Sequence, residues 1–429
     1  MIAAPDCAIP STQLPLWIPL IAQHDFPVAS YTAVSARGVH VAFEDGRRRL
    51  CAKSGLWNAN LGYGNPRIAE AIATELEAAS YLPLFRTAHR KAIEAANALL
   101  SLPAHRFQRV VFSTSGGAAN DAGMKLARQY FALDGQPERK IIVGLTGSYH
   151  GLTYGSQALS GDDLGQAVYG VDRRNIRHIR FDDGGAELAQ LMFREGRRVA
   201  AVIVEPVLGS GADVVPESFL DSLLKLREEH GFLVVADEVA TGFGRVNSWF
   251  VSDEWPSAPD VIVTSKALTN GTSACAALLI GARVTEKFDS TESVFVHGET
   301  QAGTPATCAA ILSTIDEMKR LDHGSLTAAV SAGLDDLIGR LQGTPGVGTA
   351  TGRGCMRAIK LETVDGLPLS PSGVLAVVRR IHQAGAIVQP GPSRIQLLPA
   401  LVFTKENFEE LHAAIAAGLS AARRDGAFA

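Results

Sequence analysis

Short apolar segments alternate with segments of helical periodicity through the middle of the chain. Each apolar segment has the pattern of a strand that is buried on both faces of a parallel sheet. The predicted strands are Arg109–Phe112, Lys140–Val143, Ile176–Ile179, Val199–Val204, Phe232–Ala236, Pro259–Ser265 and Ala276–Ile280. Helices are predicted between them at 119–131, 186–194 and 216–230. Strands that alternate with helices predict an α/β fold with a doubly wound, mostly parallel sheet.

The N-terminal segment has a different pattern. Five prolines among the first thirty residues predict a loosely structured arm, which we expect to lie on a partner subunit. The apolar segments Val39–Phe43 and Arg48–Ala52 flank Glu44-Asp-Gly46, and this turn chemistry predicts a β-hairpin. Amphipathic helices are expected at about 67–79 and 89–100.

The C-terminal third is predicted to form a smaller α+β portion. An alanine-rich helical stretch follows Pro305, and strands are expected near 356–361 and 395–398. A chain of 429 residues is long enough for one large domain with a smaller one attached. The expected division is an arm with part of the small domain at 1–60, a large domain at 61–310 and a C-terminal small domain at 311–429.

Composition narrows the class of protein. The chain is 46% hydrophobic and has a net charge of −4 without a basic patch, so we expect neither nucleic acid nor a membrane as a partner. The apolar stretch at 14–21 contains two prolines and has no basic region before it, which argues against a signal peptide. The cysteines are odd in number, scattered and without metal-ligand spacing, so we expect free thiols, no metal and a cytoplasmic location. They are Cys7, Cys51, Cys275, Cys308 and Cys355.

An acid and a lysine stand at the carboxyl ends of two predicted strands. Asp237 follows Phe232–Ala236, and Lys266 follows Pro259–Ser265. Open α/β sheets bind ligands at this edge. An amine to hold an aldehyde and an anion to keep a pyridine nitrogen protonated are what pyridoxal phosphate (PLP) requires. A surface lysine and a strand-end carboxylate placed by chance are the alternative, and the pair alone does not decide between the two explanations.

A phosphate site is predicted where the first of these strands ends. Ser113-Thr-Ser-Gly-Gly117 lies between a strand and a helix, so Gly116 and Gly117 can turn backbone N–H groups toward an anion. Ser115 can donate a further hydrogen bond. By itself such a segment is more often an ordinary turn. Its position at the end of a strand of the same sheet favours a phosphate site.

The flat ring of PLP requires side chains on both of its faces. Tyr149, in the loop after the second strand, is placed to stack on one face, and Val239 on the other. A loop tyrosine with its hydroxyl group in water is the alternative. His150 is expected to support the Tyr149 loop, and a part in proton transfer is its alternative role.

Several separate motifs in a fixed order make nearly the whole chain resemble the class III, or omega-type, aminotransferases of PLP fold type I. The matching motifs are Gly55-Leu-Trp57 with Gly62-Tyr-Gly64, Ser113–Asn120, Tyr149-His-Gly151, Glu205-Pro206, Asp237-Glu-Val239 with Thr241–Arg245, Lys266–Gly271 and His297-Gly-Glu-Thr300. The resemblance implies a large PLP-binding domain and a small domain built from both chain ends. It also implies a homodimer in which Thr300 is donated by the second subunit.

The resemblance also implies roles for individual residues. Lys266 and Asp237 are the implied catalytic residues, and Trp57 is an implied wall of the substrate pocket. The implied cofactor-binding residues are Ser115, Gly116, Gly117, Tyr149, Glu205, Asp237, Val239, Lys266 and Thr300.

Three positions depart from the family pattern. Ala118 stands where an acid is usual, and Gln301–Pro305 replaces an aromatic residue followed by Gly-His-Pro. Gln389 stands where many members have an arginine that binds a substrate carboxylate. Because glutamine carries no charge, we expect a carbonyl acceptor whose distal side is neutral. Arg394 and Arg245 are the alternative partners for a carboxylate.

The segment 113–121 also resembles, more weakly, aminotransferases of daptide-type peptide natural products, whose acceptor is a C-terminal ketone of a modified peptide. The predicted function is amino transfer from a small amine or amino-acid donor to a ketone or aldehyde, with such a peptide as one candidate acceptor. An omega-amino acid:pyruvate-type aminotransferase, or a PLP mutase, decarboxylase or epimerase, is the alternative on the same scaffold. A PLP-binding scaffold without turnover is a further alternative, against which the intact Lys266 and Asp237 argue.

Overall fold

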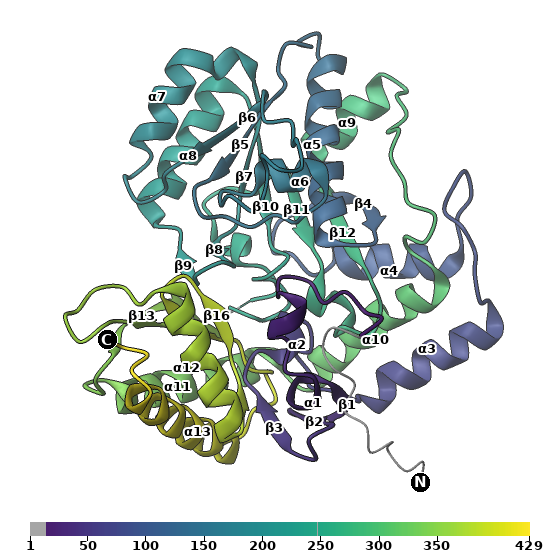
Figure 1. Ribbon diagram of the computed structural model, residues 1–429. Helices are drawn as coiled ribbons and strands as arrows, with labels where there is room; N and C mark the ends of the chain where they lie inside the picture. The colour runs from purple at the N-terminus through teal and green to yellow at the C-terminus, as the bar shows by residue number, and fades with distance from the viewer. Residues whose placement is uncertain (1–13, 247) are drawn as a thin grey trace.

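The computed structural model describes residues 14–246 and 248–429. A seven-stranded sheet forms the centre of the upper part of the molecule in Figure 1. In spatial order its strands are β4 (Phe107–Ser113), β12 (Ala276–Gly281), β11 (Val261–Thr264), β10 (Leu233–Asp237), β7 (Val199–Val204), β5 (Ile141–Leu145) and β6 (Ile176–Ile179). β12 runs antiparallel to both of its neighbours, whereas the other strands are parallel to one another. The predicted mostly parallel sheet is confirmed.

Helices cover both faces of this sheet, which explains why its strands are apolar throughout. Successive residues of a strand point to opposite faces. Val234 packs in the core that contains residues of α7 (Ala186–Glu195) and α8 (Glu217–His230), and Val235 packs with residues of α5 (Gly116–Leu133). In Figure 1, α7 and α8 lie to the left of the sheet and α5 to the right.

The remaining elements of the large sheet region connect or flank these layers. The predicted helices at 67–79 and 89–100 are confirmed as α3 and α4, and α10 packs against both. These elements are α3 (Pro66–Ala78), α4 (Arg90–Leu100), α6 (Tyr154–Leu159), α9 (Ala282–Ser290), α10 (Pro305–Arg320), β8 (Val207–Leu208), β9 (Asp213–Val214), η3 (Gly196–Arg198), η4 (Val251–Glu254) and η5 (Lys266–Thr269).

Two four-stranded sheets form the lower part of the molecule. The first is ordered β1 (Ala33–Arg37), β2 (His40–Phe43), β3 (Arg48–Cys51), β15 (Ala386–Ile387), and the second β13 (Val347–Arg353), β14 (Met356–Leu361), β17 (Arg394–Leu397), β16 (Gln389–Gly391). β2 and β3 form the predicted hairpin. The helices beside these sheets are α11 (His323–Leu341), α12 (Pro371–Ala384) and α13 (Lys405–Arg424).

The two ends of the chain share one sheet, because β15 pairs in parallel with β3. The small domain is therefore built from both ends, as predicted. The division of the chain into domains at residues 60 and 310 remains a proposal. Residues 1–13 of the predicted arm lie outside the described residues; the rest of the arm contains the short turns η2 (Gln23–Asp25) and α1 (Val28–Tyr31).

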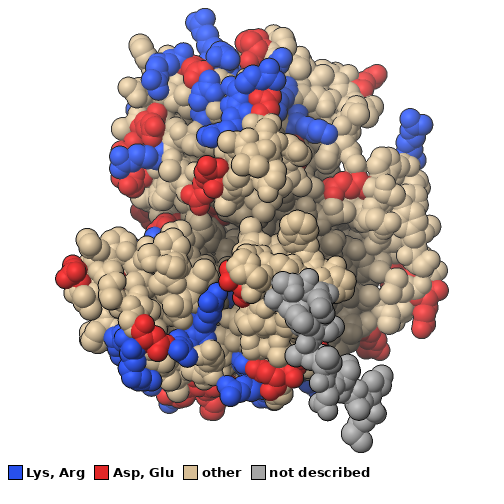
Figure 2. All heavy atoms as spheres, viewed as in Figure 1, with Lys and Arg blue, Asp and Glu red and all other residues tan. Residues whose placement is uncertain are grey.

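Lys and Arg side chains gather near the top of the view in Figure 2, with acidic side chains among them. Many exposed arginines are paired with acids, for example Arg174 with Asp172 at 2.8 Å and Arg180 with Asp182 at 2.9 Å. Such pairs balance much of the positive charge locally. In the described part of the chain, no helix is long and apolar enough to cross a membrane.

Candidate active site

A cavity of about 430 Å³ lies at the carboxyl ends of strands of the large sheet. It brings together eight of the predicted residues, from the end of β10 and from the segments that follow β4, β5, β7, β10 and β11. The lining residues are Ser115, Gly116, Gly117, Asn120, Tyr149, His150, Gly151, Leu152, Thr153, Glu205, Asp237, Val239, Ala240, Ser265 and Lys266. The structure therefore has a cavity at the sheet edge where the sequence predicts a binding site.

Lys266 opens the turn η5 and is separated from the end of β11 by Ser265 alone. Its backbone has a φ of 48°, in the left-handed region that costs a side-chain-bearing residue about 1–2 kcal/mol. Burial lowers the pKa of its ammonium group to about 8, although the negative charges of Asp237 and Glu205 act in the opposite direction. The Nζ atom lies 4.5 Å from the centroid of the Trp57 ring. A buried lysine with a lowered pKa is suited to attack a carbonyl carbon.

Asp237 ends β10 and is 2% exposed. Its Oδ2 accepts hydrogen bonds from His150 Nδ1 at 2.7 Å and from Asn120 Nδ2 at 2.8 Å, and its Oδ1 accepts one from the Val239 N–H at 3.1 Å. These three donors hold the carboxylate in one orientation at the cavity wall. The adjacent Glu238 bonds instead to the Thr241 hydroxyl group and to the Ser252 N–H.

His150 is fully enclosed and holds Asp237 as well as its own loop. Burial opposes the charged imidazolium, but the hydrogen bond to Asp237 and the charges of Asp237 and Glu205 outweigh this effect and raise the pKa of His150. The backbone N–H of His150 donates to Ser160 Oγ at 3.0 Å, and this bond anchors the Tyr149 loop. The predicted supporting role is consistent with these contacts, and the bond to Asp237 was missed.

Asn120 was also missed as a member of the site. It donates from Nδ2 to both Asp237 and the His150 carbonyl oxygen, at 2.8 and 3.0 Å. It lies four residues after Gly116 in α5, and residues at this spacing share one face of a helix. This spacing could have identified Asn120 from the sequence, because a residue on the same helix face as Gly116 is expected to point toward the site.

Glu205 supports the loops around the cavity. It accepts the N–H of Tyr149 at 2.8 Å and the N–H of Gly209 at 3.0 Å. Burial, with a smaller contribution from the charge of Asp237, raises its pKa to about 7. Glu205 thereby fixes the backbone from which the Tyr149 ring projects.

The N-terminus of α5 has the features of an anion-binding site. Ser115 caps the helix, because its Oγ accepts the Ala118 N–H at 3.2 Å. A Cβ atom at Gly116 would lie 3.0 Å from Val239 Cγ1, and one at Gly117 would lie 3.1 Å from Ser156 Oγ. Glycines therefore leave room that other residues would fill, at a helix N-terminus that favours phosphate. With Lys266 and Asp237 in the same cavity, the residues present fit PLP.

Four predicted residues do not line this cavity, namely Thr300, Trp57, Gln389 and Arg394. Thr300 is exposed, and its carbonyl oxygen accepts the Tyr81 hydroxyl group at 3.0 Å. Trp57 is buried against Val207 and Ala240, with its ring facing Lys266. Gln389 Oε1 accepts a hydrogen bond from Lys53 Nζ at 3.2 Å.

Arg394 and Arg245, the two arginines considered as carboxylate partners, both form hydrogen bonds with other groups of the protein. Arg394 Nη1 binds Asp213 Oδ1 at 2.9 Å and the Gly211 carbonyl oxygen at 2.7 Å. Arg245 is 1% exposed and donates to Ser54 Oγ at 2.9 Å and to other oxygens around it. The structure brings neither arginine to the cavity.

Comparison with known proteins agrees with this site. Residues 21–419 match the family model described as "Aminotransferase class-III". The chain is 27% identical to the omega-aminotransferase of Caulobacter vibrioides, over 92% of this chain and 94% of that protein. It is also 27% identical to the beta-alanine–pyruvate aminotransferase of Pseudomonas aeruginosa, over 94% and 95% of the two chains. The structure of the omega transaminase of Pseudomonas jessenii with PMP superposes with a TM-score of 0.91 at 25% identity, covering 97% of this chain and 99% of that one.

The chain therefore belongs to the class III aminotransferases, and it is a PLP-dependent transaminase with fold type I. Its substrates are an amine donor and a carbonyl acceptor. The resemblance read from the motifs is confirmed at the level of family, fold, cofactor and reaction type.

Proposed function

We propose that Lys266 and Asp237 are the catalytic residues with which this transaminase moves an amino group from an amine or amino-acid donor to a ketone or aldehyde. The observation that carries the proposal is their position in one cavity, at the ends of the adjacent parallel strands β10 and β11. Ser115, Gly116 and Gly117 would hold the phosphate of PLP. Tyr149 and Val239 would lie against its ring, and Glu205 would fix the Tyr149 loop.

Bound PLP supplies an electron sink that stabilises the charge left when the donor carbon loses a proton. Asp237 would hold the proton at the pyridine nitrogen, and His150 and Asn120 keep its carboxylate in place for this. Lys266 Nζ would accept the proton of the donor carbon, because a pKa lowered to about 8 leaves about a tenth of the amine unprotonated at pH 7, far more than an ordinary lysine offers. Trp57 shields this amine from water.

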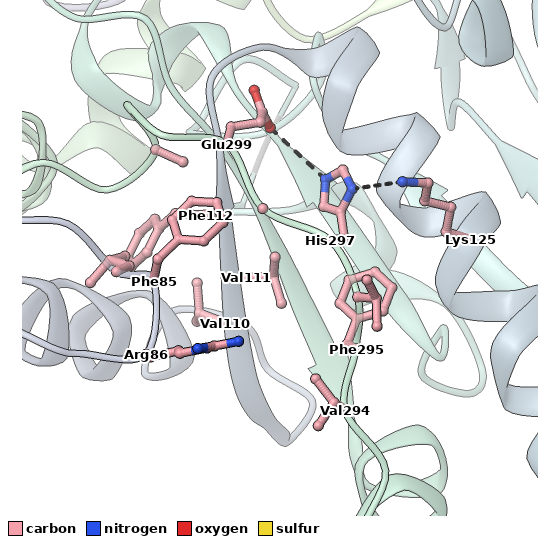
Figure 3. A pocket seen from close by; sticks show the side chains of 14 residues that line it. Phe85, Arg86, Val110, Val111, Phe112, Lys125, Val294, Phe295, His297 and Glu299 are labelled. Atoms are coloured by element: carbon pink, nitrogen blue, oxygen red, sulfur yellow. Dashed lines mark hydrogen bonds and ion pairs between the residues drawn. The ribbon is translucent and has the colours of Figure 1, made fainter.

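We propose further that the active enzyme is a homodimer and that Thr300 serves the partner's cavity. A cleft of about 740 Å³ lies beside the segment that carries Thr300. Figure 3 shows Phe85, Val111 and Val294 around it, with His297 between Lys125 and Glu299. Val296 is 81% exposed and Phe85 is 56% exposed, which is unusual for apolar side chains beside a cleft. A second copy that covers this face would explain both the exposure of these side chains and the absence of Thr300 from the lining of its own cavity.

Mixing of two inactive variants tests the shared site. In a mixed dimer of Lys266→Ala and Thr300→Ala chains, one site carries both lesions and the other carries neither. Activity should rise on mixing to about a quarter of that of the wild type when subunits exchange at random. If exchange is demonstrated and activity does not rise, Thr300 does not act across an interface.

The donor and the acceptor are also proposals. Omega-amino acid:pyruvate exchange is supported by the names of the relatives, and the C-terminal ketone of a modified peptide is the second candidate, supported by the resemblance of segment 113–121. We propose a cytoplasmic location because the described cysteines are all unpaired.

Spectroscopy of the purified, PLP-loaded enzyme tests the function. A donor amine should convert the absorbance of lysine-bound PLP into that of pyridoxamine phosphate, and a carbonyl acceptor should restore it. Release of CO2 with an unchanged final spectrum would identify a decarboxylase instead.

A further inference from the structure

A substrate carboxylate that leaves water needs a cation in the site. Gln389 provides no charge at the position where many relatives have an arginine. Arg394 is neutralised by Asp213, and Arg245 is enclosed by oxygen atoms of its own fold. A carboxylate site, if one exists here, therefore requires another cation.

Lys53 is a cation with no acidic partner among the described residues. It directly precedes the turn α2 (Ser54–Trp57), and its carbonyl oxygen accepts the Trp57 N–H at 2.8 Å. It is partly buried, and its ammonium group donates to Gln389 Oε1 at 3.2 Å. Burial lowers the pKa of Lys53. An ammonium group in this state gains from an incoming anion, since an opposite charge within hydrogen-bond distance favours the charged form that burial disfavours.

The strand register places this pair on the side of the active site. Gln389 of β16 lies directly opposite Gln396 of β17, and residues opposite each other in antiparallel strands share one face of the sheet. Gln396 Nε2 donates to the carbonyl oxygens of Gly209 and Ser210, at 3.0 and 2.6 Å. The Gly209 N–H in turn donates to Glu205, which lines the cofactor cavity.

Trp57 and Gly209 form the boundary between the two regions. A Cβ atom at Gly209 would lie 3.0 Å from the Trp57 ring, and the same ring faces Lys266 Nζ at 4.5 Å. Lys53 does not line the cofactor cavity, and its backbone carbonyl oxygen accepts the N–H of Trp57, four residues further along the chain. A carboxylate bound there is separated from the reacting carbon by a spacer.

We propose that Lys53, positioned by Gln389, is the cation that binds the carboxylate of the substrate, and that this substrate carries its amine or carbonyl group at a distance from the carboxylate. The proposal rests on the proposed transaminase site and names the residue that would select the first of its two candidate substrate classes, the omega-amino acids. This proposal replaces the expectation of an acceptor whose distal side is neutral. That expectation rested on the missing charge at Gln389, but the side chain of Gln389 binds the ammonium group of Lys53.

Matched acceptors test this proposal on the holoenzyme. With one fixed donor, kcat/KM is measured for an oxo acid that carries a terminal aldehyde and for the aldehyde with a methyl group in place of the carboxylate. In Lys53→Met the ratio of the two values should fall at least tenfold, whereas Lys53→Arg should keep it within about threefold. The exposed Lys140, at the start of β5, provides the matched control: Lys140→Met should leave the ratio unchanged.

Gln389 provides a second, independent pair of variants. Gln389→Glu would place an anion on Lys53 and should lower the ratio as Lys53→Met does. Gln389→Leu leaves the ammonium group free and should keep the preference for the acid. If Gln389 itself recognised the carboxylate, Gln389→Leu would lower the ratio and overturn the assignment to Lys53.

Two readouts separate this proposal from the transaminase site itself. Borohydride trapping of PLP on Lys266 should be normal in Lys53→Met, which shows that the cofactor site is intact. Calorimetric binding of a short monocarboxylate to the holoenzyme should weaken at least tenfold in Lys53→Met, whatever the turnover. Equal losses for the acid and the methyl compound, or unchanged monocarboxylate binding, would show that Lys53 is only structural.

Discussion

Lys266 and Lys53 are both lysines whose pKa is lowered by burial, but their surroundings differ. Lys266 lies among the charged groups of Asp237 and Glu205, on a strained backbone at the end of a parallel strand. Lys53 has one neutral partner, which lies 336 residues away along the chain. In the proposed site, strand ends of one sheet hold the reacting groups, whereas a contact between the two chain ends holds the group proposed to select the substrate.

The largest expected effect is the loss of Lys266. In Lys266→Ala no borohydride-stable adduct with PLP should form and turnover should be abolished, because the only proposed covalent anchor is missing. Circular dichroism should show an intact fold. Peptide mapping of the reduced wild-type adduct provides the control, and a label on any other lysine would contradict the assignment.

The next effect is expected at Asp237. Asp237→Asn keeps the shape but cannot hold a proton on the pyridine nitrogen, so kcat should fall a hundredfold or more, about 3 kcal/mol. Glu238→Gln is the matched control, since Glu238 bonds to Thr241 and Ser252. A variant of Asp237 within a few-fold of the wild type would show that another acid has this role.

The pKa of Lys266 predicts the pH dependence of PLP capture by the apoenzyme. The free amine is the reacting form, and with a pKa of about 8 its fraction rises about fiftyfold between pH 6 and pH 8. The rate of adduct formation, followed by stopped-flow absorbance, should rise by a similar factor and level off above pH 8. A rate that still rises steeply up to pH 10 would mean that burial does not lower this pKa.

A smaller effect is expected at His150. His150→Phe removes one of three donors to Asp237, so kcat should fall about tenfold, or about 1.4 kcal/mol. A spectroscopic titration of bound PLP should show that its ring nitrogen loses its proton at a pH different from that of the wild type, because the charge and the orientation of the Asp237 carboxylate both depend on this bond. An unchanged titration with reduced kcat would assign His150 to the Tyr149 loop alone.

The sequence predicted the large sheet well because its strands are continuous apolar segments. The same strands identify Asp237, since it ends β10 and faces the cavity whereas Glu238 turns away. The antiparallel direction of β12 was not specified, because an apolar strand has the same composition in either direction. Strands β1, β8, β9, β13, β15 and β16 were missed, and their residues are more polar or their length is short.

Contacts between distant segments limited the prediction of the site. Arg394 was considered as a carboxylate partner because nothing in the pattern around it reveals that Asp213 binds it. The bond between His150 and Asp237 joins the loop after β5 to the end of β10, and the bond between Lys53 and Gln389 joins the two chain ends. Side-chain pairs of this kind leave no periodic signal in the sequence.

The parallel pairing of β3 with β15 has a consequence for biosynthesis. A ribosome makes the chain from its N-terminus, and domains fold as they emerge. All strands of the large sheet are complete once residue 281 has been synthesised, but β3 has no partner on this side until residues 386–387 follow. A nascent chain can therefore form its PLP cavity before Gln389 has been synthesised. The contact between Lys53 and Gln389, and with it the proposed carboxylate site, forms only after the cavity is complete.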